Sequence, residues 1–335
     1  HHGARRRDRL APALGALTLD QGNQITALRD RLDELADIPL PGTGSTPDRW
    51  RFLVGVGRRD LAHARLVEGH LDALAILHEL ARMDLVEPGG AWGVWAAQPD
   101  RLLAERSGQG WRLHGTKGWC SGSIGLDRAL VTATAEDGPR LFVIDPADTT
   151  VDLDSWNPIG MAATASHTIT LDLWVPADAA IGGIDAYVDR SGFWHGGAGV
   201  AACWYGGAEE LLAPLAAKIA EGATDAHAAL AYGIVRARLD ACAALLRRVA
   251  NGIDEHPNDV LLARPDTLAV RLAVEDAARS ALDTAAVTLG AGALSSDLPH
   301  SRRAADLTVY IRQLDVAATG TEYGRLAAAR PVVAP

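Results

Sequence analysis

The sequence predicts an α+β protein of several domains: an N-terminal helical domain (4–88), a middle antiparallel β-barrel or sandwich domain (89–190) and a C-terminal four-helix bundle (191–335). Two observations predict this class. Helical periodicity occupies both ends of the 335-residue chain, and the middle is rich in glycine, aspartate and β-forming residues. A chain of this length can also bury two or three hydrophobic cores.

The N-terminal domain is predicted to hold two helices separated by a linker. Leu28, Leu32 and Leu35 lie at helical spacing, and leucines form one broad stripe over 58–83. The segment 39–47 between them is rich in proline and glycine, which interrupt helices.

The middle domain is predicted to consist of short strands joined by turns. We expect strands over 129–134, 141–144 and 168–175, the last of which alternates strictly between apolar and polar residues. The stretch 111–114 indicates a strand that ends at Gly115, where a turn would begin. Because no helices separate these strands, antiparallel pairing in a barrel or sandwich is favoured.

The C-terminal domain is predicted to be a bundle of four antiparallel helices. Their expected ranges are 197–221, 225–252, 264–290 and 303–329. We expect Asp225 to start the second helix and Pro265-Asp266 to start the third. Alanine-rich faces on these helices favour close packing and indicate oligomerisation.

Composition argues against several classes of function. The formal net charge of −10 makes an acidic surface that repels phosphate backbones, so nucleic-acid binding is not expected. The three cysteines are widely spaced, and no CxxC or HExxH pair occurs, so we expect neither a disulfide framework nor a metal site. Charges break every apolar stretch before 18 residues, and no secretion signal is visible, which favours a cytoplasmic protein without a membrane span.

Three stretches occur in an order that is typical of one family. They are Trp92-Gly-Val-Trp-Ala-Ala-Gln-Pro99, Gly110-Trp-Arg-Leu-His-Gly-Thr-Lys-Gly-Trp-Cys-Ser-Gly122, and Gly160-Met-Ala-Ala-Thr-Ala-Ser-His167 followed by Val175-Pro176. With the helical flanks, they resemble the acyl-CoA dehydrogenase-like flavoprotein superfamily over most of the chain, which looks like a divergent member. The resemblance implies FAD as cofactor, a small-molecule substrate and a homodimer or homotetramer.

The resemblance also implies where the flavin would bind. Trp119 would pack at the isoalloxazine ring and the Ser121 hydroxyl would reach toward N5, since an indole offers a flat surface and a hydroxyl there tunes the flavin. Val94 and Trp95 would edge the ring, and Arg302 would contact the cofactor from the start of the family's last helix. A core tryptophan, a turn serine and a structural charge at a helix start are the alternatives for these positions.

Two phosphate contacts of the family are missing. The Gly-Ser pair that follows the first stretch in the family is absent near 98–101. Ala229 stands where an arginine precedes an aromatic-glycine pair, here Tyr232-Gly233. FMN is therefore an alternative to FAD.

The catalytic base of the family is not evident. Thr319 stands where the family turn carries glutamate, and threonine cannot act as that base. Asp315 and Glu322 are the nearest carboxylates, and each is either a substitute base or a solvated helix residue. Oxygen-using members carry histidines after a Y-x-R-Q run, and these are absent after Tyr310-Ile-Arg-Gln313 as well.

Three functions follow from the resemblance. The first is a flavin-dependent oxidoreductase that dehydrogenates the CH–CH bond of an acyl thioester, such as an acyl-CoA, or of a similar small molecule. The second is a two-component flavin monooxygenase, favoured by the T-x-S-H stretch and the missing carboxylate. The third is a degenerate binding or assembly subunit without catalysis, favoured by the missing base and phosphate contacts.

Overall fold

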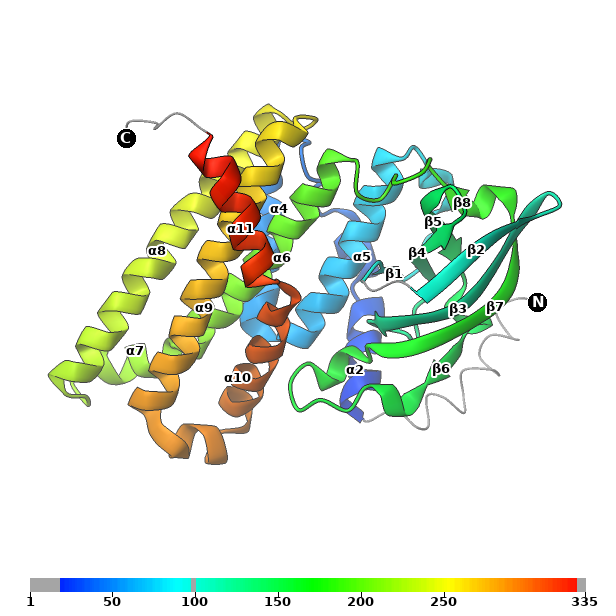
Figure 1. Ribbon diagram of the computed structural model, residues 1–335. Helices are drawn as coiled ribbons and strands as arrows, with labels where there is room; N and C mark the ends of the chain where they lie inside the picture. Colours follow the sequence, from blue (N-terminus) through cyan, green and yellow to red (C-terminus); the bar gives the residue numbers. More distant parts are fainter. Residues whose placement is uncertain (1–18, 98–100, 330–335) are drawn as a thin grey trace. The chain divides into compact units, whose positions relative to one another are not determined.

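The structure, a computed structural model, describes residues 19–97 and 101–329, and its elements follow the predicted order of helices, strands and helices (Figure 1). The chain divides into two compact units. The sheet unit comprises the described residues up to Ile38, Arg65–Pro158 and Ala162–Phe193; the helical unit comprises Pro39–Ala64, Ile159–Met161 and the described chain from Trp194 onward. Residues 4–18 of the predicted N-terminal domain lie outside the described residues, and the three-domain boundaries stay a prediction.

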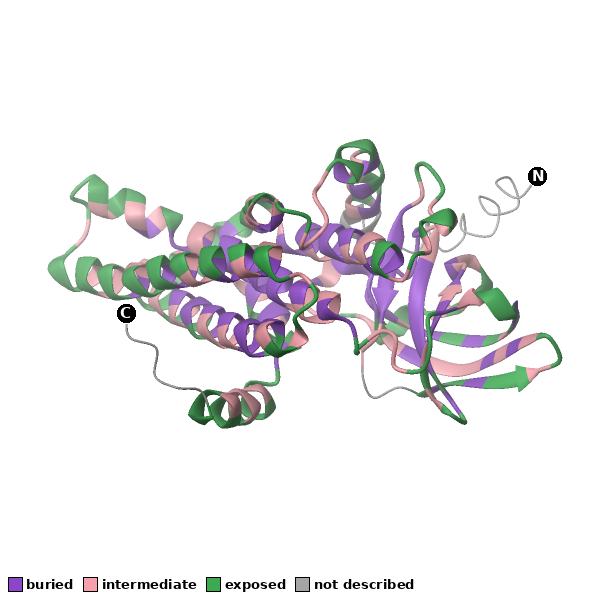
Figure 2. Ribbon diagram, turned by 90° about the horizontal axis from the view of Figure 1, so that it is seen from above, coloured by how far each residue is buried: buried purple, intermediate pink, exposed green. Residues whose placement is uncertain are grey.

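The described part of the sheet unit contains eight strands. They are β1 (Trp92–Trp95), β2 (Arg101–Ser107), β3 (Gly110–Cys120), β4 (Arg128–Ala135), β5 (Gly138–Ile144), β6 (Thr150–Asp152), β7 (His167–Pro176) and β8 (Ala180–Ile181). They form one sheet in the order β6-β7-β3-β2-β4-β5-β8, with β1 also paired to β4. The predicted antiparallel pairing holds except that β1 and β2 both run parallel to β4. Figure 2 shows buried and exposed residues alternating along the longer strands.

Among the described residues, three helices belong to the sheet unit: α2 (Leu19–Arg29), α3 (Leu32–Ala36) and most of α5 (Leu61–Glu79). The leucine stripe predicted over 58–83 corresponds to α5. Ala73, Ile76 and Leu77 of this helix share one buried cluster with Trp92 and Val94 of β1. Because burying each large apolar side chain contributes about 1.5–3 kcal/mol, this cluster fixes β1 on the helix.

The prediction that Gly115 ends a strand is wrong, because β3 continues through it to Cys120. Gly115 has φ +121°, a conformation that residues with a side chain rarely adopt. A Cβ atom here would also lie 2.2 Å from the carbonyl oxygen of Arg101. The glycine therefore lets β3 pass closely beside the start of β2 instead of turning.

The helical unit is formed by α4 (Thr46–Arg59), the main part of α6 (Ser191–Leu211), α7 (Ala213–Ala220), α8 (Ala226–Glu255), α9 (Val260–Ser296), α10 (Leu298–Tyr310) and α11 (Val316–Ala328). Asp225 starts α8 as predicted, since its carboxylate accepts a hydrogen bond from Ala228 N at 2.9 Å. None of the described helices combines the length and apolarity that a bilayer-spanning helix needs.

Several helix boundaries differ from the prediction. The helix predicted over 197–221 begins earlier, at Ser191, and is divided into α6 and α7. α9 begins at Val260 rather than at Pro265, because the Asp259 carboxylate accepts a hydrogen bond from Leu262 N at 3.1 Å and caps the helix earlier. The helix predicted over 303–329 is divided into α10 and α11, because Leu314 is extended and Asp315 starts a new helix.

Helices α4 and α6 approach each other at glycines. A Cβ atom on Gly57 of α4 would lie 2.3 Å from the carbonyl oxygen of Cys203 on α6. A Cβ atom on Gly206 of α6 would lie 2.2 Å from the carbonyl oxygen of Val54 on α4. The two backbones are therefore in direct contact, and any side chain at either glycine would separate them.

A half-buried carboxylate ties three helices of this unit together. Glu209 of α6 accepts hydrogen bonds from Arg58 of α4 and from Arg236 Nη1 of α8, the latter at 2.8 Å. Burial acts to raise the pKa of Glu209, but the hydrogen bonds from Arg236, Arg58 and Tyr205 outweigh it and hold the pKa below its usual range. The charged form of Glu209 is thus the one that the fold stabilises.

The Gly57→Ala substitution should lower the free energy of unfolding by about 1–3 kcal/mol, because the new methyl group meets a backbone carbonyl that cannot move alone. Gly55→Ala, on the same helix, is the matched control: a Cβ there has no neighbour within 4 Å, so we expect no loss and a gain of up to about 1 kcal/mol. Urea denaturation measures both, and equal losses would contradict the backbone contact.

Candidate functional site

Strand β1 positions the first pair of predicted cofactor residues. Val94 and Trp95 are both buried, and the Trp95 indole N–H donates a hydrogen bond to the carbonyl oxygen of Ser121 at 2.9 Å. The Trp95 ring therefore fixes the turn after β3, and only the backbone of β1 is available to edge a ligand. The missing Gly-Ser segment falls next to residues 98–100, which lie outside the described residues.

Trp119 is turned outward at the end of β3. Its side chain is 65% exposed and its backbone has φ +60°, a strained conformation for a residue with a large side chain. The register of β3 against β7 shifts between Lys117 and Cys120. Lys117, in contrast, is turned inward and donates to Thr132 Oγ1 at 2.7 Å. The irregular strand end thus presents one large indole face at the surface of the sheet unit.

A chain of three buried hydroxyls lies behind this strand end. Ser121 Oγ lies 2.8 Å from Ser166 Oγ, and Ser166 Oγ lies 2.7 Å from Thr164 Oγ1. The exposed fractions of the three residues are 8%, 5% and 1%. Sequence reasoning selected Ser121 but missed Thr164 and Ser166. The T-x-S-H stretch that contains both was the available signal, but spacing alone does not show which partner such hydroxyls meet.

His167, the last residue of that stretch, belongs to a second polar pair. Ser123 Oγ lies 2.8 Å from His167 Nδ1 and donates to the carbonyl oxygen of Ala165 at 2.9 Å. A hydroxyl has one proton to donate, so the imidazole is assigned as the donor at Nδ1. Burial lowers the pKa of His167, which favours this neutral form.

Arg302 lies on α10 in the helical unit, where it is exposed. Four residues later, Asp306 is buried and accepts a hydrogen bond from Met161 N. Burial raises the pKa of Asp306 to about 6. The hydrogen bond from Met161 N acts to lower this pKa, and the negative charge of nearby Asp60 acts to raise it. A Cβ atom on Gly160 would lie 2.0 Å from the carbonyl oxygen of Ala305, so this glycine lets the Met161 segment reach Asp306.

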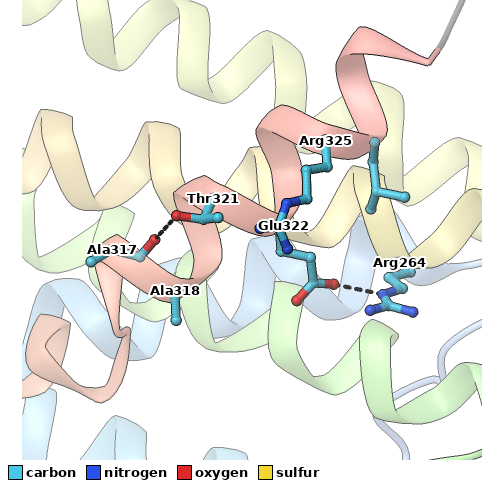
Figure 3. A pocket seen from close by; sticks show the side chains of 7 residues that line it. Arg264, Ala317, Ala318, Thr321, Glu322 and Arg325 are labelled. Atoms are coloured by element: carbon cyan, nitrogen blue, oxygen red, sulfur yellow. Dashed lines mark hydrogen bonds and ion pairs between the residues drawn. The ribbon is translucent and has the colours of Figure 1, made fainter.

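The two predicted catalytic carboxylates both have partners on or beside α11. Asp315 accepts a hydrogen bond from Ala318 N at 2.9 Å and so caps this helix. Glu322 accepts one from Arg264 Nε of α9 at 2.6 Å. Figure 3 shows Glu322 directed toward Arg264 in an open depression. The residues that line it are Arg264, Ala317, Ala318, Thr321, Glu322, Arg325 and Leu326.

These placements bring Trp95, Trp119 and Ser121 together in the sheet unit, with Val94 on the same strand as Trp95. In the helical unit, Asp315 caps α11 and Glu322 lies within it, about two turns further on. Arg302 is held by a different helix of that unit. The residues implied by the family motifs thus form one cluster around the end of β3 and separate positions on α10 and α11.

The buried Asp306 predicts a specific pH dependence. Its pKa is raised in the folded protein, so its contribution to stability is complete below its unfolded pKa, near 4, and is lost as pH rises through about 6. Between pH 5 and 8 the unfolding free energy of the wild type should fall by about 1–2 kcal/mol relative to Asp306→Asn, whose side chain keeps an acceptor for Met161 N. Parallel pH dependences in urea denaturation would contradict this assignment.

Comparisons with known proteins place the fold. No protein-family model and no curated protein matches the chain. Solved structures that match it over nearly its full length include methanesulfinate monooxygenase MsuC from Pseudomonas fluorescens, with 17% identity and a TM-score of 0.76; the match covers 98% of this chain and 97% of that one. XiaF from Streptomyces sp., in complex with FADH2 and glycerol, has 18% identity and a TM-score of 0.72, and the match covers 98% of this chain and 99% of that one. TdsC from Paenibacillus sp. A11-2, with FMN and indole, has 16% identity and a TM-score of 0.73, and the match covers 93% of this chain and 97% of that one. The chain therefore has the acyl-CoA dehydrogenase-like fold that its sequence motifs predict.

Proposed function

We propose that the protein is a flavin-dependent monooxygenase that takes reduced flavin from a separate reductase. The observation that carries the proposal is the exposed Trp119 at the end of β3, two residues before the buried Ser121. An indole face offers a stacking surface for a planar ring, and a hydroxyl two residues away offers a polar contact at the ring's edge. The structures of the same fold contain FADH2 in XiaF and FMN in TdsC, which supports a flavin as the planar group.

The residues at this strand end fit a flavin. Trp95 holds the Ser121 carbonyl and so fixes the turn that carries the Ser121 hydroxyl, two residues after Trp119. A contact of Arg302 with the cofactor's phosphates stays a prediction from its sequence motif. A bound flavin would supply the redox chemistry, and the chain's own residues would supply the stacking surface, the hydrogen bonds and the exclusion of water.

Oxygen insertion is favoured over dehydrogenation by the state of the α11 carboxylates. Dehydrogenation of an acyl thioester needs a carboxylate base that is available to remove a proton. Asp315 is engaged by a backbone N–H and Glu322 by a guanidinium. A monooxygenase does not need this base, because molecular oxygen is the oxidant and a bound reduced flavin would supply two electrons. One oxygen atom would enter the substrate and the other would leave as water.

Trp119→Ala should weaken the binding of FMN or FAD by about 1–3 kcal/mol, the scale of aromatic stacking, with little change in thermal stability because the indole is exposed. Trp174→Ala is the matched control, since Trp174 on β7 is similarly exposed, at 62%, but lies near the other end of the β3–β7 ladder, opposite Arg112. Fluorescence titration with each flavin measures the affinity. An equal loss in both variants, or no flavin binding by the wild type, would contradict the site.

The reaction class has its own test. The flavin-loaded protein mixed anaerobically with an acyl-CoA should keep its oxidised visible spectrum. The protein is also given chemically reduced flavin, ¹⁸O₂ and a panel of compounds that includes indole, which TdsC binds, and methanesulfinate, for which MsuC is named. At least one compound should yield a product carrying one ¹⁸O atom. Anaerobic bleaching of the flavin by the acyl-CoA would instead identify a dehydrogenase.

A further inference from the structure

The depression between α9 and α11 carries a net positive charge. Two arginines and one carboxylate line it: Arg264 of α9, and Glu322 and Arg325 of α11. All three belong to the helical unit, and their formal charges sum to +1, whereas the whole chain carries −10. The depression has a volume of about 720 Å³, which is in the range of small-molecule sites. Because a local positive charge concentrates small anions, an acidic protein can bind an anion here.

Arg264 is fixed in a way that leaves one edge of its guanidinium free for a ligand. Its Nε donates a hydrogen bond to Glu322 Oε1 at 2.6 Å, and its Cζ lies 5.4 Å from the centre of the Trp194 ring. Within the described chain, no atom accepts a hydrogen bond from Nη1 or Nη2, and the side chain is 48% exposed. A guanidinium fixed like this can bind a carboxylate through two parallel N–H···O bonds with little loss of rotational freedom.

Arg325 supplies a second cation at the same place. It lies three residues after Glu322, so the two side chains leave the same side of α11 (Figure 3). Arg325 is exposed, and no carboxylate of the described residues lies within ion-pair distance of its guanidinium. The charge of Arg325 is therefore available to an anion that binds at Arg264.

The rest of the depression is largely apolar. Its other lining residues are Ala317, Ala318, Thr321 and Leu326. The Thr321 hydroxyl donates to the carbonyl oxygen of Ala317 at 2.8 Å, so its proton is used within α11. An apolar group placed against these residues is removed from water while a charge attached to it reaches the two arginines. The lining thus favours a ligand with an apolar body and one charged end.

We propose that this depression binds a small monocarboxylate with an apolar body, and that Arg264 and Arg325 hold its carboxylate. A single negative charge matches the net charge of +1, and the planar fork of Arg264 matches a planar carboxylate. Glu322 is then a positioning residue, because it orients Arg264. The inference goes beyond the proposed function and does not depend on a bound flavin.

Benzoate is the probe, and benzamide is its neutral counterpart of the same shape. A ligand-observed NMR titration of the full chain should give a dissociation constant of about 1 mM for benzoate and a value at least about tenfold higher for benzamide. Arg325→Gln should weaken benzoate binding about tenfold without loss of stability, because Arg325 has no ion-pair partner to lose. Arg264→Gln should weaken it at least as much, and Arg264→Lys should not restore the wild-type affinity, because lysine keeps the charge but not the fork.

Two further variants test whether these effects belong to the depression. Arg238→Gln removes an arginine of α8 whose side chain is similarly exposed, at 50%, but which does not line the depression. Trp119→Ala removes the indole that is proposed to bind flavin. Both variants should leave the affinity for benzoate unchanged.

The contrary outcomes are equally specific. No binding of benzoate by the wild type, equal binding of benzamide, or equal losses in Arg325→Gln and Arg238→Gln overturns the site. A loss in Trp119→Ala would identify the flavin site as the place where benzoate binds, and overturns the inference as well. Flavin binding is measured in its own titration, so the failure of either proposal leaves the other standing.

Discussion

The pairing of the end of β3 with the segment that leads into β7 is the constraint on which the candidate site depends. Backbone hydrogen bonds from Gly122 and Ser123 hold this segment against the turn, and the β3–β7 ladder continues from there. Trp119 and Ala165, on the two sides of the junction, both adopt positive φ. Non-glycine residues in this conformation cost about 1–3 kcal/mol each and persist only where surrounding contacts enforce it. The junction is therefore strained, and its outward indole and inward hydroxyls follow from that geometry.

Much of the fold could be predicted from local sequence, and the physical reason is periodicity. The strict alternation over 168–175 predicted β7. Helical spacing of leucines predicted α5, which is buried on most sides, and helical spacing also predicted α8, which buries one face. Helix boundaries that depend on a single capping hydrogen bond were harder to predict. Asp259 was not recognised as the cap of α9, since a proline five residues inside the helix gave the stronger local signal. Gly115 looked like a turn because sequence does not show how near β2 passes.

The candidate site could be predicted less completely, because its contacts join segments that are distant in sequence. Motif resemblance identified Trp119 and Ser121, and the structure shows that Ser121 meets Ser166, 45 residues away. No local pattern reveals such a pair. Nor could the sequence indicate that Glu322 is held by Arg264, 58 residues earlier. The roles assigned to Val94, Trp95, Arg302, Asp315 and Glu322 stay predictions.

The direct backbone contact between α4 and α6 has a consequence for how the chain folds. The helical unit is discontinuous: its first segment, Pro39–Ala64, is synthesised well before the segment from Trp194 onward that supplies Gly206. During synthesis at about 5–20 residues per second, α4 would emerge many seconds before its partner helix. Its apolar face, with Trp50 and Leu53, would remain without its native cover over that interval. A nascent chain of this protein is thus an expected client for chaperones that shield helices until a distant partner arrives.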